Sequence, residues 1–420
     1  MADRQVEVFV ELGGADVRAG DLWSHRRRGR ESATFSYATS YLERSDAYEL
    51  DPALPLVDGQ LQTPAEQALF GAFTDCAPDR RGRTLVKRAE RRRAEAANET
   101  ARGLGEIEYL LGARDDMRQG ALRFRDPESG ALLAEESSGV PRLIALPRLL
   151  AASDREQRGE ARDADLEDLL RGGSSLGGAR PKAHVVDDGG LAAIAKFPSP
   201  ADDWDVMRWE AVALALAGEA GVSVPRSRLL DVGGRAVLLV HRFDRTATGG
   251  RLGYVSAMTM LEAEDGSSRS YLEIAEAIET RSAAASEELA QLWRRVAFSV
   301  LISNTDDHLR NHGFLRESTA GWSLAPAFDL NPDPEPGPKR LSTTIGFDDG
   351  GARIDLLLGV AADFRLSEEK AGRILGEVGA ATARWREVAA DHGLESRAIE
   401  EMAPAFDHDQ AELVRSRAAP

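Results

Sequence analysis

The sequence has little cysteine, no long hydrophobic run and fewer basic than acidic residues. Its one cysteine, Cys76, cannot form a disulfide within the chain, which favours a cytoplasmic location. No apolar stretch reaches the length that spans a bilayer. The opening MADRQVEVFVEL lacks the basic and apolar regions of a signal peptide. We therefore expect a cytoplasmic protein with no membrane partner.

Positive charge is scarce, because 53 Lys and Arg face 70 Asp and Glu, for a net charge of −17. This balance argues against a chain that holds nucleic acid along its whole surface. It leaves room for a local basic patch or a basic partner. One basic segment, Pro78–Ala96, has a helical pattern. It is either a solvated helix face or a docking surface for an acidic partner.

The order of local patterns predicts the organisation of the chain. At 420 residues it is too long for one ordinary core, so we expect two or three domains or lobes. The start reads as β, with Val6, Val8 and Val10 alternating with polar neighbours. Residues 152–170 read as an exposed linker or short helix, and Leu229–Val240 reads as a hairpin around Gly233-Gly234. Beyond residue 255 the pattern is helical.

Two features of the middle region are suited to anion binding. The stretch GGSSLGGARPK, from Gly172, can point several backbone N–H groups at one anion, because no Cβ blocks close approach. The alternative is a flexible loop. Lys196 ends an apolar strand, where an unpaired lysine is costly. An anionic ligand, Glu210 on the next helix, or solvent reached by the long side chain could satisfy it.

The stretch SNTDDHLRNHGFL, which follows a strongly apolar helix, carries most of the chemical signal. Asp306 and Asn311 have the Asp-x-x-x-x-Asn spacing of a kinase catalytic loop, and Asp329 could supply a further carboxylate for Mg²⁺. The rival interpretation is a zinc site made of Asp306, His308 and His312 on a helix. It lacks the glutamate base of HExxH, and the segment is predicted to be a loop. The ordered set of features indicates phosphoryl transfer from ATP.

The chain resembles the HipA toxin kinases of bacterial type II toxin–antitoxin systems. The residues that carry this resemblance are GGARPK, AKFPS, LAGEAGVSVPRSRLL, HRFDR, NTDDHLRNHGFL and AFDLNP. The resemblance implies an α+β, two-lobed, protein-kinase-like fold with a β-rich N-terminal subdomain and an all-helical C-terminal lobe. It implies an N-terminal subdomain at residues 1–125, a kinase N-lobe at 126–250 and a C-lobe at 251–420.

The resemblance also implies roles for individual residues. Asp306 would be the catalytic base, Asn311 and Asp329 would hold Mg²⁺, and Ser175 would be autophosphorylated. The residues expected to contact ATP are Ser175, Leu176, Gly177, Gly178, Ala179, Lys196, His241, Phe243, His308 and Asn311. The family usually has glutamate at position 241 and asparagine at position 209, where this chain has His241 and Trp209.

The function that follows is an ATP- and Mg²⁺-dependent serine/threonine kinase toxin. Its expected substrate is a translation factor such as an aminoacyl-tRNA synthetase. A small HipB-like helix-turn-helix antitoxin would bind it, and DNA would be reached only indirectly, through that antitoxin. Two alternatives are a retired kinase fold that serves as antitoxin partner and co-repressor, and a small-molecule phosphotransferase.

Overall fold

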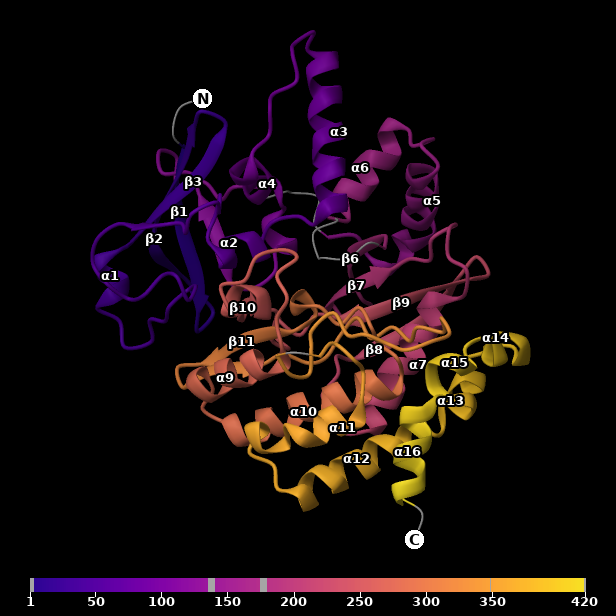
Figure 1. The fold of residues 1–420 in the computed structure, drawn as a ribbon. Helices are drawn as coiled ribbons and strands as arrows, with labels where there is room; N and C mark the ends of the chain where they lie inside the picture. The colour runs from indigo at the N-terminus through magenta and orange to yellow at the C-terminus, as the bar shows by residue number, and fades with distance from the viewer. Residues whose placement is uncertain (1–3, 135–139, 174–179, 348, 419–420) are drawn as a thin grey trace. The chain divides into compact units, whose positions relative to one another are not determined.

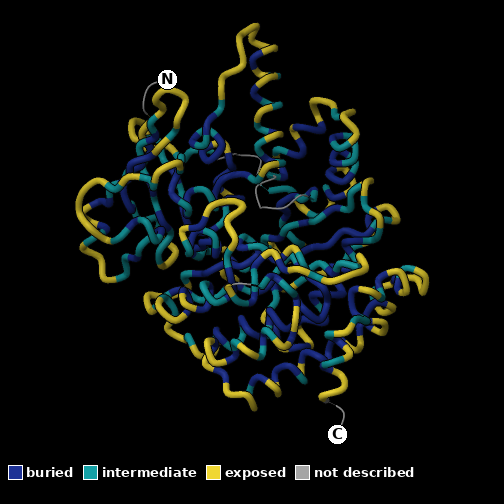
Figure 2. The backbone as a smooth tube through the Cα atoms, viewed as in Figure 1, coloured by how far each residue is buried: buried dark blue, intermediate teal, exposed yellow. Residues whose placement is uncertain are grey.

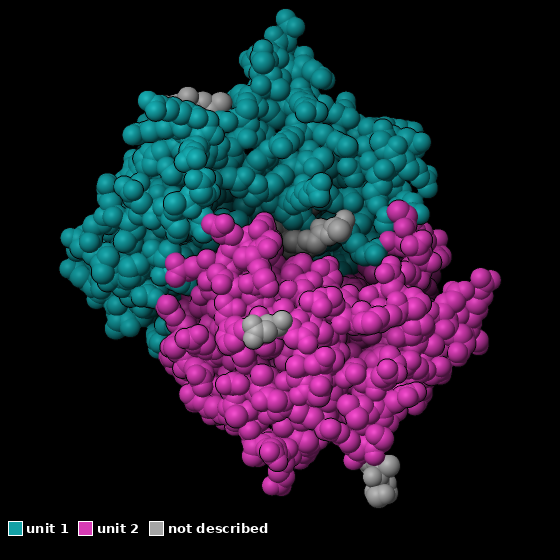
Figure 3. Space-filling model, in the orientation of Figure 1, with its two compact units in different colours: residues 1–200, 241–255, 315–319 teal, residues 201–240, 256–314, 320–420 magenta. Residues whose placement is uncertain are grey.

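The computed structural model describes residues 4–134, 140–173, 180–347 and 349–418 (Figure 1). The chain divides into two compact units (Figure 3). Unit 1 comprises residues 1–200, 241–255 and 315–319, and unit 2 comprises residues 201–240, 256–314 and 320–420. The three-part division expected from the sequence remains a prediction.

Unit 1 begins with an antiparallel five-stranded sheet in the order β4-β3-β2-β1-β5. Its strands are β1 (Arg4–Leu12), β2 (Ala15–Arg27), β3 (Arg30–Tyr37), β4 (Leu61–Gln62) and β5 (Leu122–Arg125). Val6, Val8 and Val10 of β1 are fully buried, which confirms the predicted alternation. Phe35, Phe73 and Phe124 pack together over this sheet, with ring centroids about 6 Å apart. The β-rich N-terminal part is therefore as expected.

The helices of unit 1 are α1 (Thr39–Leu42), α2 (Gly71–Asp75), α3 (Arg80–Ala96), α4 (Glu106–Gly112), α5 (Leu146–Gln157) and α6 (Asp163–Arg171). Asp79 caps α3 by accepting a hydrogen bond from the Gly82 backbone. Leu85 of α3 packs with Ala152, Leu166 and Leu169 in a small core.

Of the two alternatives expected for residues 152–170, the helical one is confirmed and the exposed linker is wrong. The segment is not an exposed linker, because α5 and α6 take up most of it and pack on each other. Two of its acidic side chains are buried against arginines: Asp165 bonds Arg155, and Asp168 bonds Arg148. Charge density alone is therefore a poor sign of exposure where each carboxylate has a guanidinium partner.

Two further strands of unit 1, β6 (Lys182–Val186) and β7 (Ala192–Lys196), pair antiparallel. In unit 2, β8 (Ser227–Val232) pairs antiparallel with β9 (Arg235–His241). Gly233 and Gly234 join β8 to β9 with φ of 63° and 81°, a left-handed pair that suits a two-residue hairpin turn. The predicted hairpin is confirmed.

Helices build most of unit 2, and the longer ones bury their apolar faces (Figure 2). They are α7 (Val206–Glu219), α8 (Ala257–Met260), α9 (Tyr271–Arg281), α10 (Ala285–Leu301), α11 (Ile354–Gly359), α12 (Glu368–Thr382), α13 (Trp385–Asp391), α14 (Ser396–Glu401), α15 (Ala403–Phe406) and α16 (Asp409–Ala418). The buried α10 contacts α9 and α12. None of the helices in the described ranges is long and apolar enough to cross a membrane.

The expected all-helical C-terminal lobe is wrong in one respect. Residues 251–420 also contain three short strands, β10 (Gly253–Ser256), β11 (Gly313–Ser318) and β12 (Gly321–Leu324). Strand β11 begins directly after His312, and its residues Phe314 and Leu315 are buried. The helical period that dominates the flanking sequence concealed these strands of four to six residues.

An aromatic cluster holds the last helices to α7. Trp385 is 1% exposed and stacks on Phe406 at 4.8 Å, while Trp209 lies 6.2 Å from Trp385.

We predict that Trp385→Ala lowers the free energy of unfolding by about 3–5 kcal/mol, because the substitution leaves a large cavity. Chemical denaturation followed by far-UV circular dichroism measures this. Ile144→Ala, at a side chain that is 91% exposed, should change stability by less than about 0.5 kcal/mol. Equal effects of the two substitutions would contradict the prediction.

Candidate functional site

A buried turn follows directly after helix α10. Ser303 is fully buried and has a φ of 53°, and the Asn304 backbone N–H donates to the Ser299 carbonyl at 2.8 Å. These contacts end the helix and reverse the chain direction. The stretch Ser303–Asn311 therefore leaves the apolar interior of unit 2 as a fixed loop, hereafter the Asp306 loop.

The two adjacent carboxylates of this loop have opposite environments. Asp306 is exposed, whereas Asp307 is only 3% exposed. The Asp307 carboxylate accepts hydrogen bonds from Tyr271 and from Ser299, the latter at 3.3 Å, and lies 3.2 Å from Nε2 of His312. Burial opposes its ionisation, but His312 and the hydrogen-bond donors lower its pKa below the ordinary value. Asp307 thus anchors the loop, and Asp306 is the carboxylate that a ligand can reach.

Asn311 is tied to Asp306 within the loop. Its side-chain Nδ2 donates to the Asp306 carbonyl at 3.0 Å, and its backbone N–H donates to the His308 carbonyl at 2.8 Å. The His308 backbone N–H in turn donates to the Asp306 carbonyl at 2.9 Å. The amide nitrogen is therefore used, and Asn311 turns its Oδ1 away from this contact as the oxygen available for a ligand.

The zinc interpretation does not fit this geometry. His308 has an extended backbone and only Leu309–Asn311 form a short 3₁₀ turn, so His308 and His312 do not share a helix face. His312 packs against Asp307 and the Tyr271 ring. Within the described ranges no group of three or more His, Cys, Asp or Glu side chains is arranged to hold a metal ion.

Asp329 lies on a second loop, residues 327–333, hereafter the Asp329 loop, which forms hydrogen bonds with the Asp306 loop. The Asn331 backbone N–H donates to Oδ1 of Asn304 at 3.2 Å, and the Thr305 hydroxyl donates to Asp333 at 3.2 Å. Asp329 has a φ of 59°, a left-handed conformation that aspartate tolerates better than most residues. The structure thus brings the Asp306 loop and the Asp329 loop together within unit 2.

The remaining predicted residues belong to unit 1. Lys196 ends β7 and stands opposite Lys182 of β6 in the strand register. His241 contacts Oδ2 of Asp187 through Nε2 at 2.9 Å, an interaction that lowers the pKa of Asp187. The Phe243 ring lies 6.3 Å from the Tyr254 ring. Ser175, Leu176, Gly177, Gly178 and Ala179 fall outside the described residues.

A buried ionic network behind His241 and Phe243 was not anticipated. Asp244 is 3% exposed and accepts hydrogen bonds from Arg242 at 2.8 Å, from Arg245 at 2.9 Å and from the Gly120 backbone at 2.7 Å. Burial opposes the charge, but the two arginines keep the pKa of Asp244 well below its usual range. The alternating charges of HRFDR, directly after an apolar strand, were the signal that could have revealed it.

The same arginines bind the backbone of residues 117–120. Arg242 donates to the Met117 carbonyl at 2.6 Å and to the Arg118 carbonyl at 2.9 Å, and Arg245 donates to the Arg118 carbonyl at 2.7 Å. Asp244, Arg242 and Arg245 therefore fix the backbone that carries His241 and Phe243.

Comparisons with known proteins agree with this architecture. The model of the HipA-like C-terminal domain family matches residues 174–385. A solved complex of HipA, HipB and operator DNA from the Shewanella oneidensis MR-1 toxin–antitoxin system is similar, with a TM-score of 0.69 at 17% identity over 98% of this chain and 96% of that chain. The expected α+β, HipA-like fold is confirmed.

A second structure, the Helicobacter pylori proinflammatory kinase CtkA, aligns with 58% of this chain and 93% of its own, at 16% identity and a TM-score of 0.45. That similarity is too low to support an argument. No curated protein sequence matches the chain.

The buried network predicts a large stability cost for losing its central charge. Asp244→Asn leaves Arg242 and Arg245 buried without a compensating carboxylate, so we expect the free energy of unfolding to fall by about 3–5 kcal/mol. Chemical denaturation gives the value. The control is Asp46→Asn, which breaks the half-exposed Arg44–Asp46 pair and should cost far less stability, because solvent screens an exposed pair. A loss at Asp244 no larger than that at Asp46 would refute the network's role.

A neutral histidine in this network predicts a pH dependence of stability. Nδ1 of His184 lies 3.3 Å from Arg242, which can only donate, so the ring is neutral. Burial, with help from Arg242 and Arg245, lowers the pKa of His184 well below 6.5. Below pH about 6.5 the unfolded chain binds a proton at His184 that the folded protein does not bind. The free energy of unfolding should therefore fall as the pH drops below this value, by up to about 1.4 kcal/mol per pH unit.

The measurement is denaturation of the wild type and of His184→Gln between pH 7 and pH 5. The substitution should flatten the profile in this range, and His25→Gln controls for the loss of an imidazole elsewhere in unit 1. Parallel profiles for the wild type and His184→Gln would show that His184 does not cause the dependence.

Proposed function

Since this chain belongs to the HipA family, we propose that it is an ATP- and Mg²⁺-dependent serine/threonine protein kinase that acts as the toxin of a toxin–antitoxin pair. The observation that carries the proposal is the direct bonding of the Asp306 loop to the Asp329 loop. Phosphoryl transfer needs a base and metal-binding oxygens held in one arrangement, and these two loops supply both residue types.

The residues of unit 2 fit a magnesium ion bound to nucleotide phosphates. Mg²⁺ takes oxygen ligands and uses one or two carboxylates besides phosphates and water. Asn311, whose nitrogen is occupied by the Asp306 carbonyl, and Asp329 would hold it. When bound, the ion neutralises charge that develops on the phosphates.

Asp306 is the residue proposed to act on the protein substrate. Its exposed carboxylate would accept the proton of a serine or threonine hydroxyl. The hydroxyl oxygen forms a bond to the γ-phosphorus, the bond from that phosphorus to the bridging oxygen breaks, and ADP leaves. The buried Asp307 does not compete for this role, because its oxygens face Tyr271, Ser299 and His312.

Residues of unit 1 are proposed to bind the nucleotide. Lys196 would contact the phosphates, and the backbone of residues 175–179 would cover them. His241 and Phe243 would lie beside the adenine, and His308 of unit 2 would add a further contact. Ser175 is the proposed site of autophosphorylation. These assignments rest on the motifs GGARPK, AKFPS and HRFDR.

The proposed partners follow from the same family. A HipB-like helix-turn-helix antitoxin would bind this chain and connect it to operator DNA, as the Shewanella complex contains HipA, HipB and operator DNA. The proposed substrate is a translation factor such as an aminoacyl-tRNA synthetase, and the proposed location is the cytoplasm.

Mass spectrometry of the intact chain before and after incubation with Mg-ATP tests the proposal. We expect a gain of one phosphate that maps to Ser175, and loss of this gain in Asp306→Asn or Asp329→Asn by at least about two orders of magnitude in rate. Asp307→Glu, which keeps the charge, should retain part of the activity. Phosphate gain by Asp306→Asn at the wild-type rate would exclude Asp306 as the base. No gain by an unphosphorylated, ATP-binding wild type would favour the retired-kinase alternative.

A further inference from the structure

Helix α3 concentrates positive charge on an acidic chain. It carries eight cationic residues within Arg80–Ala96, although the net charge of the whole chain is −17. In Figure 1 its C-terminal half projects beyond the other helices of unit 1. The sequence left two interpretations open for this helix, and the partners of each cation decide between them.

Three of the cations bind the neighbouring helical pair. Arg81 and Arg88 both contact Glu156 of α5, at 2.6 and 2.7 Å, and Arg92 contacts Asp163 at the start of α6. Arg83 contacts Glu106 of α4, and Arg93 pairs with Glu90 of α3 itself and with Glu99 just after the helix. Four of these five cations attach α3 to its neighbours in unit 1, and all five are paired with acidic side chains, which offset their charge.

The other three cations, Arg80, Lys87 and Arg91, form one exposed row, hereafter the α3 stripe. They and Thr84 are all exposed and follow one another at intervals of four, three and four residues, which places them on a single line along the helix. Within the described ranges no acidic side chain pairs with any of the three, and Lys87 contacts only the Tyr109 ring. The row spans about 16 Å at about 1.5 Å per residue.

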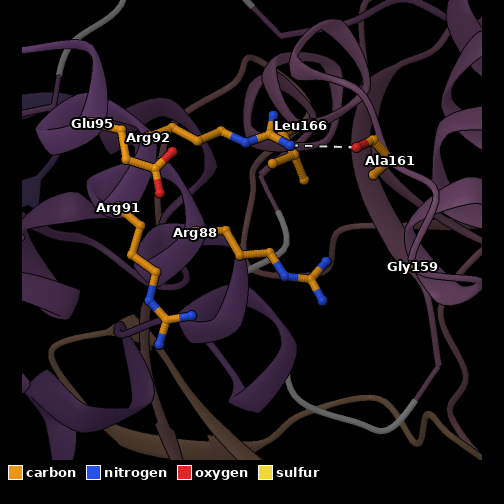
Figure 4. Close-up of a pocket in the computed structure, with 7 residues that line it drawn as sticks. All are labelled: Arg88, Arg91, Arg92, Glu95, Gly159, Ala161 and Leu166. Atoms are coloured by element: carbon orange, nitrogen blue, oxygen red, sulfur yellow. Dashed lines mark hydrogen bonds between the residues drawn. The ribbon is translucent and has the colours of Figure 1, made fainter.

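A cavity of about 260 Å³ opens beside the C-terminal half of α3. Arg88, Arg91, Arg92 and Glu95 line one wall, and Gly159 and Ala161 lie on the other (Figure 4). Arg92 donates to the Ala161 carbonyl at 3.3 Å, whereas the Arg91 guanidinium points away from that carbonyl (Figure 4). Arg91 is the last cation of the α3 stripe, because the next position on the same line of the helix, four residues further on, is the acidic Glu95.

We propose that the α3 stripe binds the phosphate backbone of duplex DNA. A stable protein interface needs large apolar or aromatic anchors at its centre, and the stripe offers only three cations and a threonine. A phosphate backbone needs only cations on a line, because the contacts are electrostatic and independent of sequence. A rigid helix that presents them over about 16 Å matches about five base-pair steps. This inference stands apart from kinase activity, and it adds a direct DNA contact to the route through an antitoxin that the resemblance implies.

The stripe should contribute a small, strongly salt-dependent affinity. Three phosphate contacts predict a slope of about −2.7 for the logarithm of the binding constant against the logarithm of the salt concentration. That slope corresponds to an affinity loss of about fortyfold between 50 and 200 mM salt. The acidic remainder of the surface repels DNA, so binding should be detectable only at low salt.

The test is fluorescence anisotropy of a labelled 20-base-pair duplex of arbitrary sequence, titrated with the full chain over a salt series. The variant is R80Q/K87Q/R91Q, in which glutamine preserves helix propensity, with circular dichroism as a check of folding. The matched control is R4Q/R27Q/R228Q, which removes three exposed cations that lie on three separate strands. We expect the stripe variant to lose at least tenfold in affinity at low salt and the control to lose less than threefold.

Three outcomes would overturn the proposal. The first is a wild type that does not bind the duplex at about 20 mM salt, where screening is weakest. The second is an equal loss in the control, which would assign the effect to net charge. The third is a stripe variant that binds DNA like the wild type but loses affinity for poly-L-glutamate, which would assign the stripe to an acidic protein. A protein without phosphotransfer that shows the expected DNA result would disprove the proposed function and leave this inference intact.

Discussion

A carboxylate can stay ionised inside a protein only where cations and hydrogen-bond donors surround it, and both units are organised around this requirement. In unit 1 the constraint acts on Asp244, whose partners include the Gly120 backbone, 124 positions away in the sequence. In unit 2 it acts on Asp307, which unites α9, α10 and the Asp306 loop through Tyr271, Ser299 and His312. Each buried charge fixes segments that have little apolar surface of their own.

The constraint also separates two neighbouring carboxylates by role. Asp306 and Asp307 are adjacent and chemically identical. The buried Asp307 is bonded to neighbouring side chains, whereas the exposed Asp306 is accessible to a ligand. The Asn311 amide, bonded to the Asp306 carbonyl, then holds both residues in one rigid turn. In the proposed roles of base and metal ligand, two residues that are fixed in advance would need little rearrangement when substrate binds. The bonds from Asn304 and Thr305 extend this rigidity to the Asp329 loop.

Pairing also determines what the surface charge of α3 means. Counting the arginines of this helix suggests a large basic patch, but five of its eight cations bind acids of the same unit. Glu156 of α5 and Asp163 of α6, which lie in the charged segment 152–170, are the partners of three of these cations. Only the unpaired remainder, a narrow row on one face, presents charge to a partner.

Much of the fold and of the candidate site followed from local sequence. The alternation in β1, the Gly233-Gly234 hairpin and the Asp306–Asn311 spacing each depend on neighbours within a few residues, and the sequence displays such patterns directly. The short strands β10, β11 and β12 were missed because four to six residues carry too weak a period against a helical background. The proximity of the Asp329 loop to the Asp306 loop depends on hydrogen bonds from the Asn331 backbone to Asn304 and from Thr305 to Asp333, which local sequence does not display. By itself the sequence determined the family and the residue types at the candidate site. Only the tertiary structure decided which carboxylates and arginines are buried in pairs and which face solvent, because pairing depends on contacts between residues far apart in the chain.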